Sequence, residues 1–202
     1  MSFSKLKICI LICILLTCFA INVRKSSAQK KTDISNSAIT LFSFDRADEA
    51  EWTVVNDGVM GGRSAGFVTV ENGTLRFTGT LVTRGGGFTL VRARRQVDMT
   101  GYAGVELRVR GSGRRFEVEL DDGSRWNGRS VSRRAAFETS AEWTLVRVPF
   151  TALRSTIFGQ AVNAPPIDLA RIQSVALYMA DGEDGAFRLE VDHIRAFDDA
   201  GR

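Results

Sequence analysis

The segment from residue 105 to residue 120 decides the fold class, and its sequence is Val105-Glu106-Leu107-Arg108-Val109-Arg110-Gly111-Ser112-Gly113-Arg114-Arg115-Phe116-Glu117-Val118-Glu119-Leu120. Apolar and charged residues alternate on both sides of the glycine pair. A strand that buries one face and exposes the other produces this period of two residues. The glycines supply the turn between the two strands. The segment therefore predicts an antiparallel hairpin with one face in a core.

The same alternation recurs along most of the chain. Leu75, Phe77 and Leu81 share one parity in the run 74–81, and Asn72-Gly73, a pair that two-residue hairpin turns prefer, joins this run to 67–71. Further short runs lie at 39–44, 88–93, 135–139, 143–150, 175–179 and 187–191. About ten short strands without a long helical period predict an all-β fold, an antiparallel β-sandwich or jelly roll.

The predicted domain covers residues 39–198, with a tail at 199–202. Residues 151–166 have no clear period and are predicted to form a long surface loop, which Pro165 and Pro166 stiffen at its end. The length suits one sizeable core better than two.

The N-terminus has the pattern of a secretory signal peptide over residues 1–28. Lys5 and Lys7 precede an apolar run at 8–23, and small residues follow at 26–28. The run is shorter than the roughly 20 residues that span a bilayer, so a retained anchor is the weaker alternative. A lipoprotein site at Cys18 is a further alternative.

Residues 29–38 are polar and predict a flexible lead-in to the domain. The expected location of the protein is therefore periplasmic or extracellular, with no transmembrane segment in the mature chain. Cys9, Cys13 and Cys18 all lie in the predicted signal peptide, so the mature domain has no thiol for a disulfide, a metal or a nucleophile.

The charge of the mature chain is balanced. Four of the 27 basic residues and none of the 23 acidic residues fall within 1–28. The mature domain then has no general electrostatic attraction for nucleic acid or for an anionic membrane, although a local patch is compatible with these numbers.

Two glycine-rich loops are the candidate functional surface. The first is Asn56 to Ser64, and the second is Gly85-Gly86-Gly87-Phe88, followed by Arg92. Loops of this kind are either tight corners of a β-protein or surfaces for a ligand or partner. The residues that we expect to contact a ligand or partner are Asp57, Met60, Arg63, Ser64, Arg92, Arg110 and Trp126.

Two interpretations of these residues stay open. In the structural one, Arg92 points inward, pairs with Asp57 and ties the two loops together. In the functional one, Asp57, Arg63, Ser64, Arg92 and Arg110 line a polar patch.

The aromatic residues suggest a second type of ligand. Trp126-Asn127-Gly128-Arg129 follows an Asp-Gly turn and has a composition that suits stacking on a sugar, although Trp126 can also pack under its own hairpin. Trp52 and Trp143 are predicted to lie in the core.

Catalytic resources are few. His193 is the single histidine, and it shares the parity of Phe187, Leu189 and Val191, which predicts a core or core-edge position. Asp57, Asp121 and Asp122 lie in loops, and no spacing identifies an acid and a nucleophile. We therefore expect no enzyme activity and no cofactor, with a glycan hydrolase as the remaining catalytic alternative. A calcium site near Asp45 and Asp192 stays open.

Several motifs in one order resemble the complex I intermediate-associated protein 30 family across about residues 41–197. They are Trp52, the loop Asn56 to Ser64, Phe77 with Gly79, Gly86-Gly87-Phe88 with Arg92, Arg110-Gly111 with Gly113-Arg114, Trp143 with Val148-Pro149-Phe150, and Phe187-Arg188-Leu189-Glu190.

The resemblance implies a jelly roll similar to galactose-binding-like domains. It also implies an assembly factor for respiratory NADH:ubiquinone oxidoreductase, which holds an incomplete membrane subcomplex and catalyses nothing. The expected function is thus a non-catalytic, protein-binding scaffold. A carbohydrate-binding module is the alternative, and nucleic acid is not an expected partner.

Overall fold

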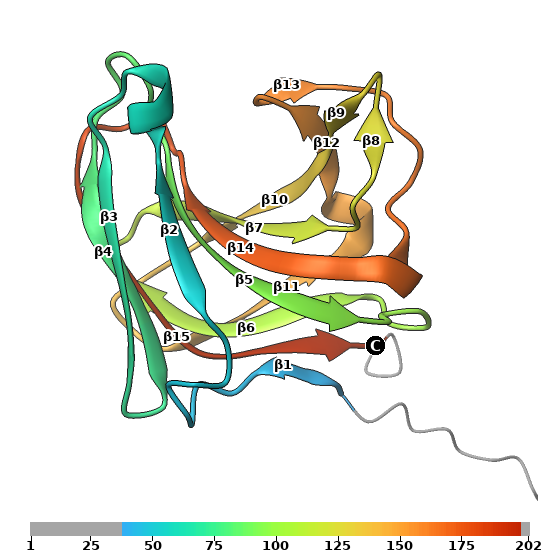
Figure 1. Ribbon diagram of the computed structural model, residues 1–202. Coiled ribbons are helices and arrows are strands. Elements are labelled where there is room, and N and C mark those ends of the chain that lie inside the picture. Colours follow the sequence, from blue (N-terminus) through green and yellow to red (C-terminus); the bar gives the residue numbers. More distant parts are fainter. Residues whose placement is uncertain (1–37, 199–202) are drawn as a thin grey trace, which may run out of the picture. The chain divides into compact units, whose positions relative to one another are not determined.

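The computed structural model describes residues 38–198, which form an all-β fold of fifteen strands and three short 3-10 helices (Figure 1). The predicted all-β antiparallel class is confirmed. Within 38–198 no helix has the length and apolar character needed to cross a bilayer. The predicted signal peptide, nearly all of the lead-in and the tail at 199–202 lie outside the described residues.

One sheet has six strands in the order β11-β6-β15-β4-β3, and β1 also pairs with β15. The bounds are β1 Thr40–Phe42, β3 Ala65–Glu71, β4 Thr74–Leu81, β6 Gly104–Gly111, β11 Thr144–Pro149 and β15 Gly185–Phe197. All of these pairings are antiparallel. Asn72 and Gly73 join β3 to β4 with φ of 52° and 71°, so the predicted hairpin turn is confirmed.

The second sheet has seven strands in the order β13-β12-β10-β7-β14-β5-β2. The bounds are β2 Trp52–Asn56, β5 Thr89–Val97, β7 Arg115–Asp121, β10 Ser132–Glu138, β12 Arg154–Ile157, β13 Gln160–Ala161 and β14 Ile172–Met179. A separate hairpin joins β8 Arg125–Trp126 to β9 Arg129–Ser130. The helices are η1 Asp57–Met60, η2 Phe150–Ala152 and η3 Leu169–Arg171.

The predicted long loop at 151–166 is wrong in part, because it contains the hairpin β12–β13. The turn of this hairpin is Phe158-Gly159, with φ of 49° and 77°. A phenylalanine is rare at such a position, so the sequence carries no turn signal there.

The inward faces of the two sheets share one core. The apolar residues of the 105–120 hairpin, Val105, Leu107, Val109, Phe116, Val118 and Leu120, are all 0% exposed, as the alternation predicts. Phe77 meets the rings of Phe187 and Phe116 edge to face, with centroids 4.9 and 6.4 Å away. Removing one such ring would cost about 3–5 kcal/mol. Both sheets and the core between them lie within residues 38–198.

A β-bulge in β15 corrects the prediction for His193. Val191 pairs with Val109 and His193 pairs with Arg108, so Asp192 is an extra residue and the register shifts there. The bulge reverses the parity of the following residues, and Ile194 enters the core in place of His193. The His193 side chain is 12% exposed, and its Nδ1 lies 2.7 Å from Asp192 Oδ2.

The two predicted core tryptophans have different positions. Trp52 packs against the core, with its ring centroid 5.0 Å from that of Phe42, as predicted. The prediction is wrong for Trp143, which lies under the guanidinium groups of Arg108 and Arg110 at 4.9 and 4.7 Å. Both arginines belong to the polar parity of β6, so Trp143 is on the outer face of the six-stranded sheet.

Candidate functional site

The carboxylate of Asp57 joins the two glycine loops. Asp57 is completely buried at the start of η1. Its Oδ1 accepts a hydrogen bond from Ser64 N at 3.0 Å, and its Oδ2 accepts one from Ser64 Oγ at 2.7 Å. Oδ2 also accepts hydrogen bonds from the second loop, from Gly87 N at 2.7 Å and Phe88 N at 3.3 Å. One charge therefore fixes both loops relative to each other.

The glycines make room for this carboxylate. A Cβ atom at Gly62 would lie 2.1 Å from Asp57 Cγ, and one at Gly86 would lie 2.4 Å from Asp57 Oδ2. Gly61 ends η1 in the left-handed region with φ of 83°, which a glycine adopts without strain. The glycine-rich composition of both loops thus follows from close packing around Asp57.

The hydrogen bonds lower the pKa of Asp57. Burial, the largest single effect, would raise the pKa, because it disfavours the charged form. The donors Gly87 N, Ser64 Oγ, Phe88 N and Ser64 N together outweigh burial and hold the pKa below its ordinary value. Asp57 is therefore an ionised structural acceptor.

The first loop presents two of the predicted residues to solvent. Met60 is 65% exposed, and Arg63 is also exposed. Ser64 is only 6% exposed, and its hydroxyl accepts a hydrogen bond from Val82 N at 3.1 Å. Met60 and Arg63 are therefore available to a partner, whereas Asp57 and Ser64 make the hydrogen bonds that fix the loop conformation.

The predicted pair between Asp57 and Arg92 is wrong. Arg92 and Glu119 both pair with Ala176, from opposite sides of β14, so they share the outer face of the seven-stranded sheet. Arg92 Nη2 lies 2.6 Å from Glu119 Oε1. Of the structural interpretation, only the tie between the two loops agrees with the structure, and backbone N–H groups with the Ser64 hydroxyl make that tie in place of the arginine.

A polar cluster surrounds Tyr178 on this outer face. The Arg134 guanidinium lies 4.7 Å from the Tyr178 ring centroid, and Arg134 Nη1 lies 3.0 Å from Glu117 Oε2. The Glu119 side chain is 3% exposed. Glu119 Oε2, Arg92 Nε and Arg134 Nε are buried without a hydrogen-bond partner among residues 38–198. We call Arg92, Glu117, Glu119, Arg134 and Tyr178 the Tyr178 cluster.

The sequence indicates this cluster only in part. The alternation places Glu117 and Glu119 on the polar face of their strand, but it does not reveal that β5 and β10 bring Arg92 and Arg134 to the same face. That information lies in the strand order.

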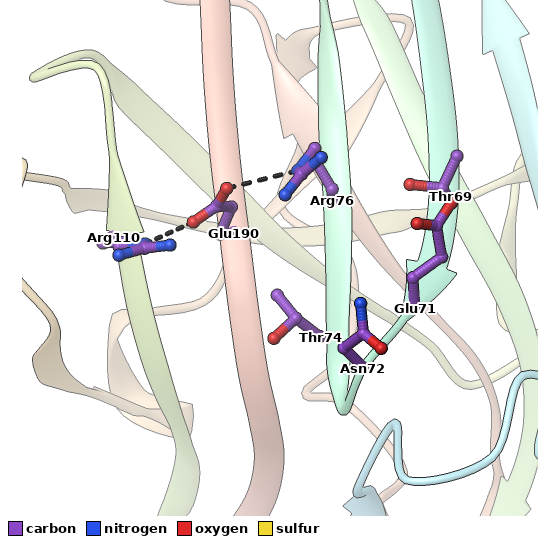
Figure 2. Close-up of a pocket in the computed structure, with 7 residues that line it drawn as sticks. All are labelled: Thr69, Glu71, Asn72, Thr74, Arg76, Arg110 and Glu190. Atoms are coloured by element: carbon purple, nitrogen blue, oxygen red, sulfur yellow. Dashed lines mark hydrogen bonds and ion pairs between the residues drawn. The ribbon is translucent and has the colours of Figure 1, made fainter.

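Arg110 belongs to a different surface, so the structure does not bring it together with Asp57. It lies on the outer face of the six-stranded sheet, where Figure 2 shows Glu190 between Arg110 and Arg76. Arg76 Nε is 3.2 Å from Glu190 Oε1, and Arg110 Nε donates to Glu190 Oε2. A pocket of about 210 Å³ opens here, lined by Thr69, Glu71, Asn72, Thr74, Arg76, Arg110 and Glu190.

Both arginines hold Glu190 ionised. Burial would raise the pKa of Glu190, but the hydrogen bond from Arg110 and the charges of Arg110 and Arg76 lower it below its ordinary value. In this pocket Glu190 is therefore an ion-paired carboxylate and not a free general acid or base.

Residues 38–198 contain no group of three or more His, Cys, Asp or Glu side chains that could hold a metal ion. Asp192, considered above for calcium, contacts Arg108 Nη1 at 3.2 Å and His193 Nδ1 at 2.7 Å. Trp126 is half-buried on β8, away from the two glycine loops in the chain, beside its Asn127-Gly128 turn.

Solved carbohydrate-binding modules share the fold. The family 11 module of the Clostridium thermocellum cellulase Lic26A-Cel5E superposes with a TM-score of 0.55 at 14% identity, over 80% of this chain and 94% of the module. The family 30 module of the Clostridium thermocellum cellulase Cel9D-Cel44B gives a TM-score of 0.51 at 12% identity, over 81% and 99%. At these identities the likeness concerns the fold alone, and it confirms a galactose-binding-like β-sandwich.

Mitochondrial proteins are similar in sequence. The complex I intermediate-associated protein 30 of Mus musculus is 26% identical in an alignment 190 residues long, which covers 82% of this chain and 58% of the mouse protein. The probable complex I intermediate-associated protein 30 of Caenorhabditis elegans is 23% identical in an alignment 194 residues long, which covers 81% of this chain and 55% of that protein. The chain thus spans a little over half the length of these relatives.

The model of one family matches residues 42–191, which include both glycine loops, the Tyr178 cluster and the pocket at Glu190. The chain therefore belongs to the complex I intermediate-associated protein 30 family.

Proposed function

We propose that this chain is a non-catalytic binding domain that acts as an assembly-type scaffold for a protein partner. The observation that carries the proposal is the rigid presentation of Met60 and Arg63. Four hydrogen bonds to Asp57 fix the loop frame, while Met60 stays 65% exposed and Arg63 also faces solvent. A pre-ordered loop loses little entropy on binding, and methionine and arginine are enriched at protein interfaces.

The state of the carboxyl groups supports a non-catalytic role. Asp57, Asp122 and Glu190 are buried, which would raise the pKa of each one, yet hydrogen bonds lower all three, together with arginine charges at Asp122 and Glu190. The general acid of a glycoside hydrolase needs the opposite, a raised pKa near the working pH. These carboxylates serve as acceptors within the fold.

Family membership supports one class of partner for this proposal. The relatives are described as proteins associated with an intermediate of complex I. The proposed partner of this chain is accordingly an incomplete membrane-protein complex of the NADH:ubiquinone oxidoreductase type. The apolar run at 8–23 supports the further proposal that the mature protein is exported and meets its partner at the outer side of the membrane.

The test uses deletion of the gene in its own organism. We expect an assembly intermediate of the oxidoreductase to accumulate on native gels, and wild-type protein to restore the complete complex. The variants Arg63→Ala and Met60→Ser should fold normally. Each should weaken partner capture about fivefold, because it removes an interface anchor worth about 1 kcal/mol. Normal complex assembly in the deletion strain would rule out the assembly role.

A second function, carbohydrate binding, is favoured by the Tyr178 cluster. The cluster contains two arginines and two glutamates, so its net charge is zero. A neutral ligand therefore fits it better than an ion. Glu119 Oε2, Arg92 Nε and Arg134 Nε are buried without a partner among residues 38–198, so a sugar would instead contact the exposed part of the cluster, where 34% of the Arg92 side chain and 24% of the Glu117 side chain remain accessible. Sugar hydroxyl groups both donate and accept, so they fit a surface that offers arginine donors beside carboxylate acceptors.

Affinity electrophoresis through a panel of soluble glucans and galactans tests this second function. We expect retardation of the wild type by one polysaccharide, and loss of retardation in Glu119→Gln. The matched control is Glu106→Gln, which changes a carboxylate on the other sheet. If no polysaccharide changes the migration of the wild type, the carbohydrate-binding proposal fails and only the protein-binding proposal remains.

A further inference from the structure

Two short hairpins lie together at one end of the seven-stranded sheet, β8–β9 and β12–β13 (Figure 1). Their turns are Asn127-Gly128, with φ of 50° and 78°, and Phe158-Gly159, with φ of 49° and 77°. The guanidinium of Arg129 lies over the Phe158 ring, 5.4 Å from its centroid, which joins the two turns. We call residues 125–130 and 157–160 the paired tips.

Neither turn geometry nor packing accounts for Phe158. Two-residue turns of this type favour asparagine or glycine where φ is positive, and a bulky residue there is strained. The Phe158 side chain is also 79% exposed, more than the other exposed large apolar residues described, Met60, Phe67 and Leu145. Phe158 is strained in its turn, and the described chain leaves most of its side chain uncovered. This combination indicates that the ring contacts another molecule.

The paired tips also concentrate positive charge. No aspartate or glutamate occurs from Gly123 to Phe137 or from Trp143 to Ile167, although acidic and basic residues balance over the mature chain. Arg125 and Arg129 are both exposed at the tips. The side chain of Arg125 donates back to the carbonyl of Gly128, which holds it along its own turn.

We propose that the paired tips bind the surface of an anionic phospholipid bilayer. The Phe158 ring enters the boundary between headgroups and acyl chains, Trp126 lies at the level of the headgroups, and Arg125 and Arg129 meet lipid phosphates. Aromatic and basic side chains together are the composition that favours this interface. The proposal stands independently of the protein partner proposed above.

The shape of the tips favours a bilayer over a macromolecule with a fixed surface. A single ring on a two-residue turn projects outward, and a protein partner would need a matching pocket to bury it. A bilayer accepts such a ring anywhere on its surface. The guanidinium beside the ring then lies at the depth of the phosphates, because Arg129 already contacts Phe158.

Sedimentation with lipid vesicles tests the proposal on the chain from Gln29 onward, which retains both sheets and the paired tips. We expect binding to vesicles of phosphatidylcholine with phosphatidylglycerol, and little binding to phosphatidylcholine alone. Phe158→Asn recreates the Asn-Gly turn of the neighbouring hairpin, so thermal unfolding should stay equal or rise. Vesicle affinity should fall about tenfold or more, as expected for loss of one buried aromatic side chain.

Arginine variants and controls complete the experiment. Arg129→Ser should weaken binding about fivefold, the effect of one basic residue at an anionic surface. Phe67→Thr and Arg188→Ser change exposed residues of the six-stranded sheet and should leave binding unchanged.

Three results would overturn the proposal: no sedimentation of the wild type, equal sedimentation with neutral vesicles, or binding that survives Phe158→Asn. Retention of the wild type on single-stranded RNA but not on vesicles, again dependent on Phe158, would make the tips a nucleic-acid site and would end the lipid proposal.

Discussion

The Asp57 carboxylate lies 2.7 Å from the backbone nitrogen of Gly87, although 30 residues separate them in the chain. This hydrogen bond joins the two glycine loops, which connect β2 to β3 and β4 to β5 and so pass from one sheet to the other. Because the carboxylate is fully buried, and its donors belong to the buried Ser64 and the half-buried Gly87 and Phe88, water would replace the carboxylate only in part if it were removed.

Replacing Asp57 with alanine should destabilise the fold by about 3 kcal/mol, because N–H groups of both loops lose a charged, fully buried acceptor. Equilibrium unfolding in urea measures this change. Gly86→Ala should also destabilise the fold, since its Cβ would lie 2.4 Å from Asp57 Oδ2. Gly58→Ala is the matched control, because no atom lies within 4 Å of a Cβ there. Equal effects of the two glycine changes would contradict the packing argument.

The stability of the protein should fall in acid. The folded-state pKa of Asp57 is lowered, so its contribution is complete above the ordinary aspartate pKa of about 3.9 and is lost as the pH falls through the folded value. Asp122 and Glu190 act in the same direction. Urea midpoints measured from neutral pH to below about pH 4 should therefore decline, and the decline should be smaller in Asp57→Asn. An identical decline in both proteins would exclude Asp57 as a source.

Glu190 should stabilise the six-stranded sheet through its two arginines. Its side chain is 4% exposed, whereas those of Arg76 and Arg110 are 56% and 40% exposed and remain partly hydrated. Glu190→Gln should therefore cost about 1–2 kcal/mol, less than the loss of a fully buried pair. Thermal unfolding measures the change. Asp48→Asn, which breaks a pair exposed on both sides, should have no measurable effect.

Tyr178 should resist ionisation. Burial, together with the charge of Glu119, raises the pKa of its hydroxyl well above the ordinary value of about 10, against the opposing charges of Arg92 and Arg134. Because the folded-state pKa is raised, the contribution is present below about pH 10 and is lost as the pH rises toward the folded value. In alkaline absorbance titration, one of the two tyrosines should ionise only as the protein unfolds. The variant Tyr178→Phe should lack that step, and a smooth titration of both tyrosines in the folded state would contradict it.

Local patterns were sufficient for the fold class. The alternation at 105–120 identifies buried and polar faces because each strand repeats every two residues, and Asn72-Gly73 identifies a turn because both residues accept positive φ. These signals depend only on near neighbours in the chain.

The mistaken assignments involve information that is not local. The extra residue Asp192 reverses the parity of His193, and no composition rule marks a bulge at that position. Arg92 meets Glu119 because β14 lies between their strands, which only the strand order reveals. Phe158 forms a turn against its own propensity, so the hairpin β12–β13 was predicted as loop.

The position of β15 bears on the synthesis of the protein. This last strand lies between β4 and β6 and also pairs with β1, so the six-stranded sheet cannot close until residues 185–197 have left the ribosome. Until then β4 and β6 lack their common neighbour, and contacts between distant parts of a chain form slowly. The nascent polypeptide therefore cannot complete this sheet, or reach its native state, before residues 185–197 have been synthesised.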